Sequence, residues 1–240
     1  MLKKVAFDPG CEAAQHAVLR LETFHNAAAD ASRRNFPAAQ LNDAAVFFHE
    51  LSPRSRVVTY EFIARAFEFH RVANEKDANL GLHERGARMI IAAGPRIQVR
   101  TGRQRDTAHL ASILRRLQSK EISVEQAINE AFRAQPLAGH VPALQANFAF
   151  TKAYLVDDAG SKAGFAGANC FVDMSIFDEP APEWISLDKP IQWETNGMSG
   201  KFARIININR DMAARRQHAG IRDAKEIAKA LKITALDSAS

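Results

Sequence analysis

A run of arginines in the middle of the chain is the clearest chemical feature of this sequence. Six of them fall between residues 96 and 116, namely Arg96, Arg100, Arg103, Arg105, Arg115 and Arg116. A guanidinium group offers a planar fork of donors that matches phosphate oxygens, and each neutralised phosphate releases bound counterions. Arg215 and Arg216 could extend this surface from the C-terminal part of the chain. The pattern predicts binding to the backbone phosphates of a nucleic acid, RNA or DNA.

Arginine and histidine also recur at one fixed separation. Arg20 precedes His25, and Arg65 precedes His70, with four residues between them in both cases. This spacing resembles the Arg-x4-6-His signature of the HEPN ribonucleases. The resemblance implies a helical, metal-independent ribonuclease, in which histidine moves a proton and arginine stabilises the charge on the phosphorane. Arg65 and His70 are the candidate catalytic pair of this alternative, and the plainer interpretation is that the histidines are ordinary helix residues.

Charge is segregated along the chain, although the net charge is only +5. Residues 85–120 carry nine basic side chains and one acidic, residues 157–198 carry eight acidic and two basic, and residues 201–232 carry nine basic and three acidic. Segments of opposite sign can pair within one chain or between copies of it. The second alternative is therefore a self-assembling structural protein whose basic and acidic segments meet across subunits.

Motifs for metals and cofactors are missing from the sequence. Glu22 and His25 form a single Glu-x-x-His pair, whereas a di-iron carboxylate site uses two. There is no Cys-x-x-Cys, no glycine-rich phosphate loop and no Gly-x-Ser-x-Gly elbow. The acidic residues between Asp173 and Glu194 lack the lysine that metal-dependent nucleases usually add, since Asn196 occupies that place. We therefore expect no metal and no cofactor, and whether the chain is an enzyme stays open.

The composition is that of an ordinary globular protein. Of the 240 residues, 47% are hydrophobic and 25% are charged. The two cysteines, Cys11 and Cys170, argue against a disulfide scaffold and fit a reducing compartment. No stretch approaches the roughly 20 apolar residues of a membrane span, and the first residues lack the apolar run of a signal peptide. We expect a cytoplasmic protein that does not enter a membrane.

Apolar spacing predicts an α+β fold with helices in the first part of the chain. The expected helices cover residues 12–34, 38–51, 57–76, 104–118 and 123–134. Residues 96–100 alternate polar and apolar between turn signals, which predicts a basic β-arm. Ser123 and Gln126 have the spacing of a capping box.

After residue 135 the pattern changes to short strands. We expect a mixed, mostly antiparallel sheet, with strands at 145–156, 168–176, 191–195 and 202–208, followed by two short helices at 210–218 and 224–232. Asp223 and Glu226 again have capping-box spacing. The organisation is then a helical region over residues 1–135 and a β-rich region over residues 136–240, arranged as two domains or as one continuous domain.

Overall fold

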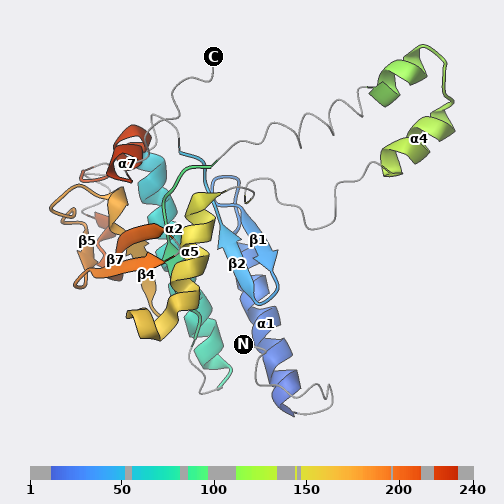
Figure 1. The fold of residues 1–240 in the computed structure, drawn as a ribbon. Coiled ribbons are helices and arrows are strands. Elements are labelled where there is room, and N and C mark those ends of the chain that lie inside the picture. The colour runs from blue at the N-terminus through green and yellow to red at the C-terminus, as the bar shows by residue number, and fades with distance from the viewer. Residues whose placement is uncertain are drawn as a thin grey trace. The chain divides into compact units, whose positions relative to one another are not determined.

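The computed structural model describes residues 12–51, 56–81, 86–96, 112–133, 144, 147–195, 197–211 and 219–231. They belong to two compact units (Figure 1). The first unit draws on Met1–Pro95 and Phe148–Ser240, and the second on Arg96–Asn147. The second unit is therefore inserted into the sequence of the first. The predicted boundary at residue 135 lies outside the described residues and stays a prediction.

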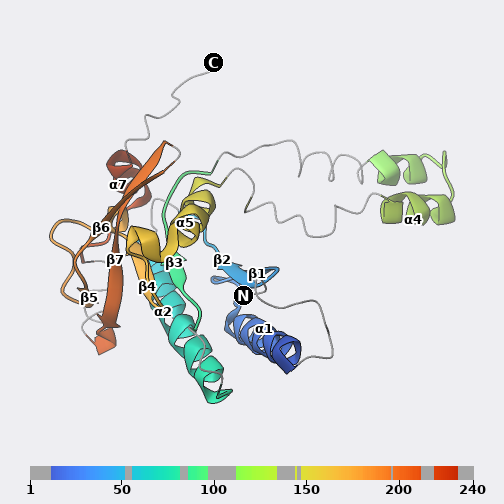
Figure 2. The same ribbon diagram turned by 60° about the horizontal axis from the view of Figure 1, so that its bottom comes forward.

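A five-stranded mixed sheet forms the centre of the first unit (Figure 2). Its strands are β3 (Met89–Ile91), β4 (Cys170–Asp173), β5 (Ile185–Leu187), β6 (Ile191–Thr195) and β7 (Met198–Ile208). β7 pairs antiparallel with β4, β5 and β6, whereas β3 pairs parallel with β4. The α+β class with a mostly antiparallel mixed sheet is thus confirmed.

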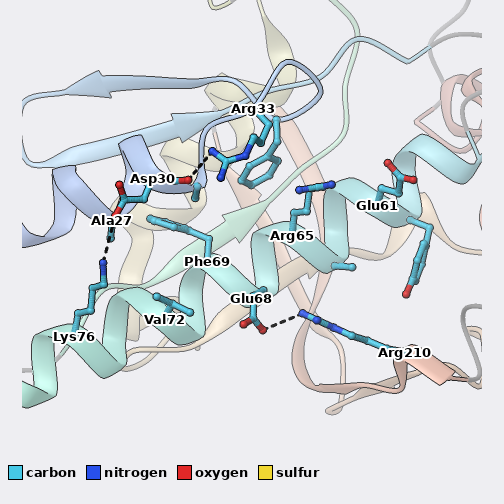
Figure 3. A pocket seen from close by; sticks show the side chains of 14 residues that line it. Ala27, Asp30, Arg33, Glu61, Arg65, Glu68, Phe69, Val72, Lys76 and Arg210 are labelled. Atoms are coloured by element: carbon cyan, nitrogen blue, oxygen red, sulfur yellow. Dashed lines mark hydrogen bonds and ion pairs between the residues drawn. The ribbon is translucent and has the colours of Figure 1, made fainter.

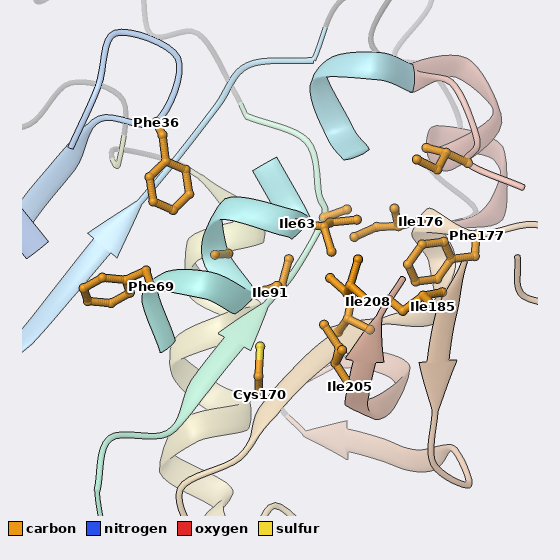
Figure 4. Packing of buried hydrophobic residues seen from close by; sticks show 14 of the residues in the cluster. Phe36, Ile63, Phe69, Ile91, Cys170, Ile176, Phe177, Ile185, Ile205 and Ile208 are labelled. Atoms are coloured by element: carbon orange, nitrogen blue, oxygen red, sulfur yellow. The ribbon is translucent and has the colours of Figure 1, made fainter. Parts of the chain in front are cut away.

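Helices cover both faces of this sheet. Because successive side chains of a strand point to opposite faces, Cys170 and Val172 face α2 (Arg56–Asn79), and Phe171 faces α5 (Phe148–Ala159). Figure 4 shows the α2 side of this core, where Ile63 of α2 meets isoleucines of the sheet. β4 is buried over its whole length as a result, which explains its apolar run Cys170–Val172, whereas β7 is buried at Phe202, Ala203, Ile205 and Ile208 and at least partly exposed elsewhere, for example at Ile206.

α1 (Glu12–Ala31) packs along the other side of α2. Arg20 is 4% exposed and binds the carboxylate of Asp77 through two hydrogen bonds of 2.6 Å, so this charge is buried with its partner. Phe24 meets Phe69 edge to face, with ring centroids 5.8 Å apart. These contacts fix the two helices side by side and confirm the helices expected at 12–34 and 57–76.

The helix expected over residues 38–51 is wrong. A hairpin of β1 (Ala38–Leu41) and β2 (Ala44–Phe47) occupies this segment. Asn42 takes φ = 51° in the two-residue loop, a left-handed conformation that asparagine tolerates better than most residues. Phe47 stacks on Phe36 with ring centroids 4.2 Å apart. This aromatic contact packs the hairpin against the segment that follows α1.

The strand expected over residues 145–156 is also wrong, because α5 forms there. Phenylalanine and threonine near its start favour strands. However, Lys152, Val156 and Ala159 recur at helical spacing and pack against the sheet. Burial of this stripe outweighs the local preference for a strand.

Several smaller expectations are confirmed. β6 covers residues 191–195 as predicted, β7 includes 202–208, and Asp223 with Glu226 forms a capping box at α7 (Ala224–Ala230). Two 3-10 helices, η3 (Gly160–Ala163) and η4 (Met174–Ile176), flank β4 in the chain. No described helix is both long enough and apolar enough to cross a membrane.

The second unit contains a pair of short helices, residues 112–118 and α4 (Val124–Arg133). Ser123 and Gln126 form the predicted capping box, each main-chain N–H donating to the side chain of the other residue. Arg96 pairs through its main chain with Asn147 at the ends of this unit. Residues 97–100 of the expected β-arm lie outside the described residues.

A buried ion pair ties α5 to the sheet. The Nζ of Lys152 lies 2.6 Å from Oδ2 of Asp173, and the two side chains are 4% and 1% exposed. Asp173 also accepts hydrogen bonds from the main-chain N–H groups of Ala93 (3.4 Å) and Ser175 (3.0 Å). Lys152 lies over the ring of Phe202, 5.3 Å from its centroid. Neither charge is left without partners in the interior.

We expect Lys152→Met to lower the free energy of unfolding by about 3–5 kcal/mol, because it leaves a buried carboxylate without its cation. The double variant Lys152→Met/Asp173→Asn should recover part of this loss, since it removes the uncompensated charge. Urea denaturation followed by tryptophan fluorescence measures both values, with Lys162→Met at an exposed position of η3 as the control. Equal losses in the single and double variants would contradict this account of the pair.

Candidate functional site

An open groove of about 600 Å³ lies between α2, the C-terminal end of α1 and the segment that follows α1 (Figure 3). Its lining combines an apolar floor with charged walls: Ala27, Asp30, Ala31, Arg33, Phe36, Tyr60, Glu61, Ala64, Arg65, Glu68, Phe69, Val72, Lys76 and Arg210. Phe36 and Phe69 of the floor are buried. A groove of this kind can hold a ligand that carries both charge and an apolar part.

The lining follows from the helical period of α2. Glu61, Arg65, Glu68 and Val72 recur every three or four residues and therefore share one side of the helix. The opposite stripe, which includes Ile63, packs into the core. The same periodicity that docks α2 on the sheet thus presents a row of charged side chains to the groove.

Two arginines of the groove have no carboxylate partner within the described part of the chain. Arg33 donates through Nη1 to the carbonyl oxygens of Asp30 (2.7 Å) and Ser32 (2.6 Å), which holds the side chain in place without neutralising it. Arg65 is exposed, and Figure 3 shows it extending from α2 toward the segment that carries Arg33. By contrast, eight described arginines form ion pairs: Arg20, Arg56, Arg71, Arg88, Arg116, Arg204, Arg210 and Arg222.

Two of the acidic groups in the groove are already paired. Glu68 binds Arg71 (2.8 Å) and Arg210 (2.9 Å), and the hydrogen bond from Arg71 is the main reason that the pKa of Glu68 is lowered. Asp30 lies 3.5 Å from the Nζ of Lys76. These contacts leave Arg33 and Arg65 as the positive charges best placed to bind an anion. Burial raises the pKa of Tyr60, so its hydroxyl stays protonated and able to donate.

The arginines predicted from the sequence are only partly within the described residues. Arg115 and Arg116 lie on the helix at 112–118, and Arg116 pairs with Glu130 of α4 at 2.8 Å. Arg96 lies at the start of the second unit. The remaining predicted positions, Arg100, Arg103, Arg105, Arg215 and Arg216, lie outside the described residues.

Arg65 and His70 both lie on α2, but the structure does not bring their side chains together. Five residues correspond to about 140° around a helix. Arg65 lines the groove, whereas Nε2 of His70 donates to the carbonyl of Ala87 at 3.1 Å, next to β3. Burial lowers the pKa of His70, so the ring is neutral at pH 7. The histidine serves here to hold the chain that leads into β3.

Asn74 completes this contact with the segment that leads into β3. Its Oδ1 accepts from the N–H of Ala87 at 2.6 Å, and its Nδ2 donates to the carbonyls of Ala87 and His70. Gly86 is required beside it, because a Cβ at that position would lie 2.2 Å from Oδ1 of Asn74. The other Arg-x4-His pair, Arg20 and His25, has a structural role at its arginine, since Arg20 forms the buried ion pair with Asp77.

The charged segments that are separated in the sequence are mixed in space. Four carboxylates of residues 157–198 pair with cations of the two basic segments: Asp157 with Arg88, Asp178 with Arg222, Glu179 with Lys201, and Asp188 with Arg204. Part of the complementary charge is therefore satisfied within one chain. The charges in these four ion pairs are therefore not available for the alternative, in which basic and acidic segments meet across subunits.

Within the described ranges, no group of three or more histidine, cysteine or acidic side chains is arranged to hold a metal ion. No family model, curated protein or solved structure matches the chain. No function can therefore be inferred from a relative, and the groove is the structural feature that best supports a functional hypothesis.

Sequence reasoning missed Arg33 as a candidate binding residue. The signal was present, since the dipeptide Arg33–Arg34 follows the end of a helix and precedes Pro37. Its place opposite Arg65 depends on the packing of α1 against α2, which spacing along the chain does not reveal.

We expect acid to destabilise the protein partly through His70. An unfolded histidine has a pKa near 6.5, whereas burial lowers the pKa of His70 in the folded state. The unfolded state therefore binds a proton more readily, and the stability contributed by neutral His70 is lost as the pH falls below about 6.5. Urea denaturation at pH 7.5 and 5.5 should show a smaller pH effect for His70→Gln than for the wild type. Unchanged pH dependence in His70→Gln would contradict this, and His16→Gln on α1 is the control.

Proposed function

We propose that the protein binds the backbone phosphates of a nucleic acid, and that the groove between α1 and α2 is a principal contact surface. The observation that carries this proposal is the pair of exposed guanidinium groups, Arg33 and Arg65, that line one groove without a carboxylate partner among the described residues. A guanidinium that is held in place but not neutralised is suited to bind phosphate oxygens.

Other features of the groove support a nucleic acid rather than a small inorganic anion. The groove is open and long enough to be lined by α2 from Tyr60 to Lys76. Proteins that bind single strands combine a positively charged groove with aromatic side chains, and the lining here carries four basic and three acidic side chains. Tyr60 supplies a half-buried aromatic ring, which Trp184 supports edge to face at 5.0 Å.

The arginines between Arg96 and Arg116 form a second proposed contact surface, in the other unit. Arg115 is exposed there, and Arg116 is shared with Glu130. The two proposed surfaces can be tested separately, because a different pair of arginine substitutions removes charge from each. The double variant Arg33→Ala/Arg65→Ala tests the groove, and Arg100→Ala/Arg103→Ala tests the second surface.

We expect Arg33→Ala/Arg65→Ala to weaken binding of labelled single-stranded RNA and DNA by roughly tenfold or more, because two charge-assisted contacts are lost. The slope of log K against log salt should become shallower by about 1.4, at about 0.7 for each phosphate contact on a single strand. Fluorescence anisotropy at several salt concentrations measures both quantities. Glu61→Gln should act in the opposite direction, because it removes a negative charge from the groove lining.

Arg204→Ala is the matched control, since Arg204 on β7 has a side chain that is 43% exposed but already forms an ion pair with Asp188. It should leave both affinity and salt slope unchanged. Loss of binding in Arg100→Ala/Arg103→Ala alone would move the site to the second unit. Equal losses of affinity in the groove variant and in Arg204→Ala would mean that any surface arginine contributes and that the groove is not a specific contact surface. Absence of binding by the wild type would overturn the proposal.

A further inference from the structure

Tyr60, the half-buried aromatic residue of the groove, rests on a fixed support. Its ring meets that of Trp184 with centroids 5.0 Å apart and planes at 88°. Trp184 is 2% exposed, donates from Nε1 to the carbonyl of Ala219 at 3.0 Å and packs edge to face against the buried Phe177. Because perpendicular rings meet at an edge of one of them, Trp184 covers at most one face of Tyr60. The Tyr60 ring is therefore held on its core side while it lines the groove.

α2 leaves space beside this ring. Ala64 follows Tyr60 by about one turn and also lines the groove. Side chains of a helix lean toward its N-terminus, so the side chain at residue 64 is the neighbour that would lie against Tyr60 along the helix. Alanine ends at Cβ and fills little of the space that a longer side chain would occupy. A planar group that enters the groove over Ala64 can therefore reach the Tyr60 ring.

Guanidinium groups lie on both sides of α2 around this space. Figure 3 shows Arg65 extending from one side of α2 toward Arg33, and Arg210 approaching Glu68 on the other side. The Arg210 side chain is 63% exposed and binds Glu68 through Nη2 at 2.9 Å, while Arg71 already binds the same carboxylate at 2.8 Å. Exchange of such a surface ion pair for a phosphate contact costs little. A chain of phosphates that crosses α2 thus meets a cation on each side of the open space.

We propose that the groove selects unpaired nucleotides by stacking one base on Tyr60, over Ala64, while the adjoining phosphates bind Arg65 and Arg210. This inference rests on the proposed binding of nucleic acid in the groove and adds the class of strand that the groove takes. Stacking on a side chain needs a free base face, which single-stranded RNA and DNA both offer. In a duplex the faces of each base are occupied by the neighbouring base pairs. Tyr60 is then the residue that distinguishes a single strand from a duplex.

Comparison of normal and abasic strands tests the stacking directly. The wild type should bind a normal single-stranded DNA roughly fivefold or more tightly than a strand of equal length without bases, because base–aromatic stacking is lost. Tyr60→Leu should lose affinity for the normal strand to a similar extent and should bind the two strands alike. Its salt slope should remain that of the wild type, since no phosphate contact is removed. Tyr60→Phe keeps the ring and should bind as the wild type does. Fluorescence anisotropy measures each of these values.

A second variant separates stacking from a change in the fold. Ala64→Leu keeps the charge of the groove and a good helix former on α2, but it fills the space beside the ring. It should therefore weaken single-strand binding as Tyr60→Leu does. Tyr154→Leu and Ala29→Leu are the matched controls, since both residues are exposed on helices and neither lines the groove. They should bind as the wild type does, and circular dichroism should show unchanged helix content in all four variants.

Duplex RNA and duplex DNA of the same sequence complete the comparison, and Tyr60→Leu should bind both as the wild type does. Equal losses of duplex and single-strand affinity in Tyr60→Leu would overturn the inference, as would a wild type that binds normal and abasic strands alike. If Arg33→Ala/Arg65→Ala still weakened binding in that case, the proposed function would stand without the stacking. Absence of binding by the wild type to every strand would overturn both.

Discussion

The parallel pairing of β3 with β4 is the constraint on which the rest of the first unit depends. It joins Met89–Ile91 to Cys170–Asp173, although the whole second unit and α5 lie between them in the sequence. A parallel pair requires a long crossover connection. α5 is the part of this connection that covers one face of the sheet, and α2, which precedes β3, covers the other. Asn74 and the buried pair of Lys152 and Asp173 then attach both helices to the ends of the two strands.

This arrangement changes the meaning of the charge pattern. Along the chain, basic and acidic residues are sorted into long segments. In the fold they meet as ion pairs, so net charge per segment says little about which cations can bind a partner. What distinguishes Arg33 and Arg65 is local: each is exposed, each lines the groove, and no described carboxylate pairs with either of them. Surface ion pairs add little stability, but they do decide which guanidinium groups remain available.

The elements that could be predicted from the sequence are those whose signal is local. α2 carries a sustained helical stripe, β6 ends at turn residues, and Asp223 with Glu226 marks a helix start. The hairpin at 38–47 and α5 were predicted wrongly because short apolar segments fit either period, and distant packing decided between them. β3 and the groove could not be predicted at all. The first requires β4 as its partner, and the second requires α1 to lie on α2 with Arg20 bound to Asp77.

The central claim is that nucleic acid lies in the groove between α1 and α2. Photo-crosslinking of the full chain to a single-stranded oligonucleotide that carries a photoreactive base, followed by peptide mass spectrometry, tests it most directly. Crosslinks should concentrate in peptides from the groove lining around Arg33 and around Tyr60 to Arg65, and they should be displaced by unlabelled strand. Crosslinks confined to peptides outside that lining would contradict the account.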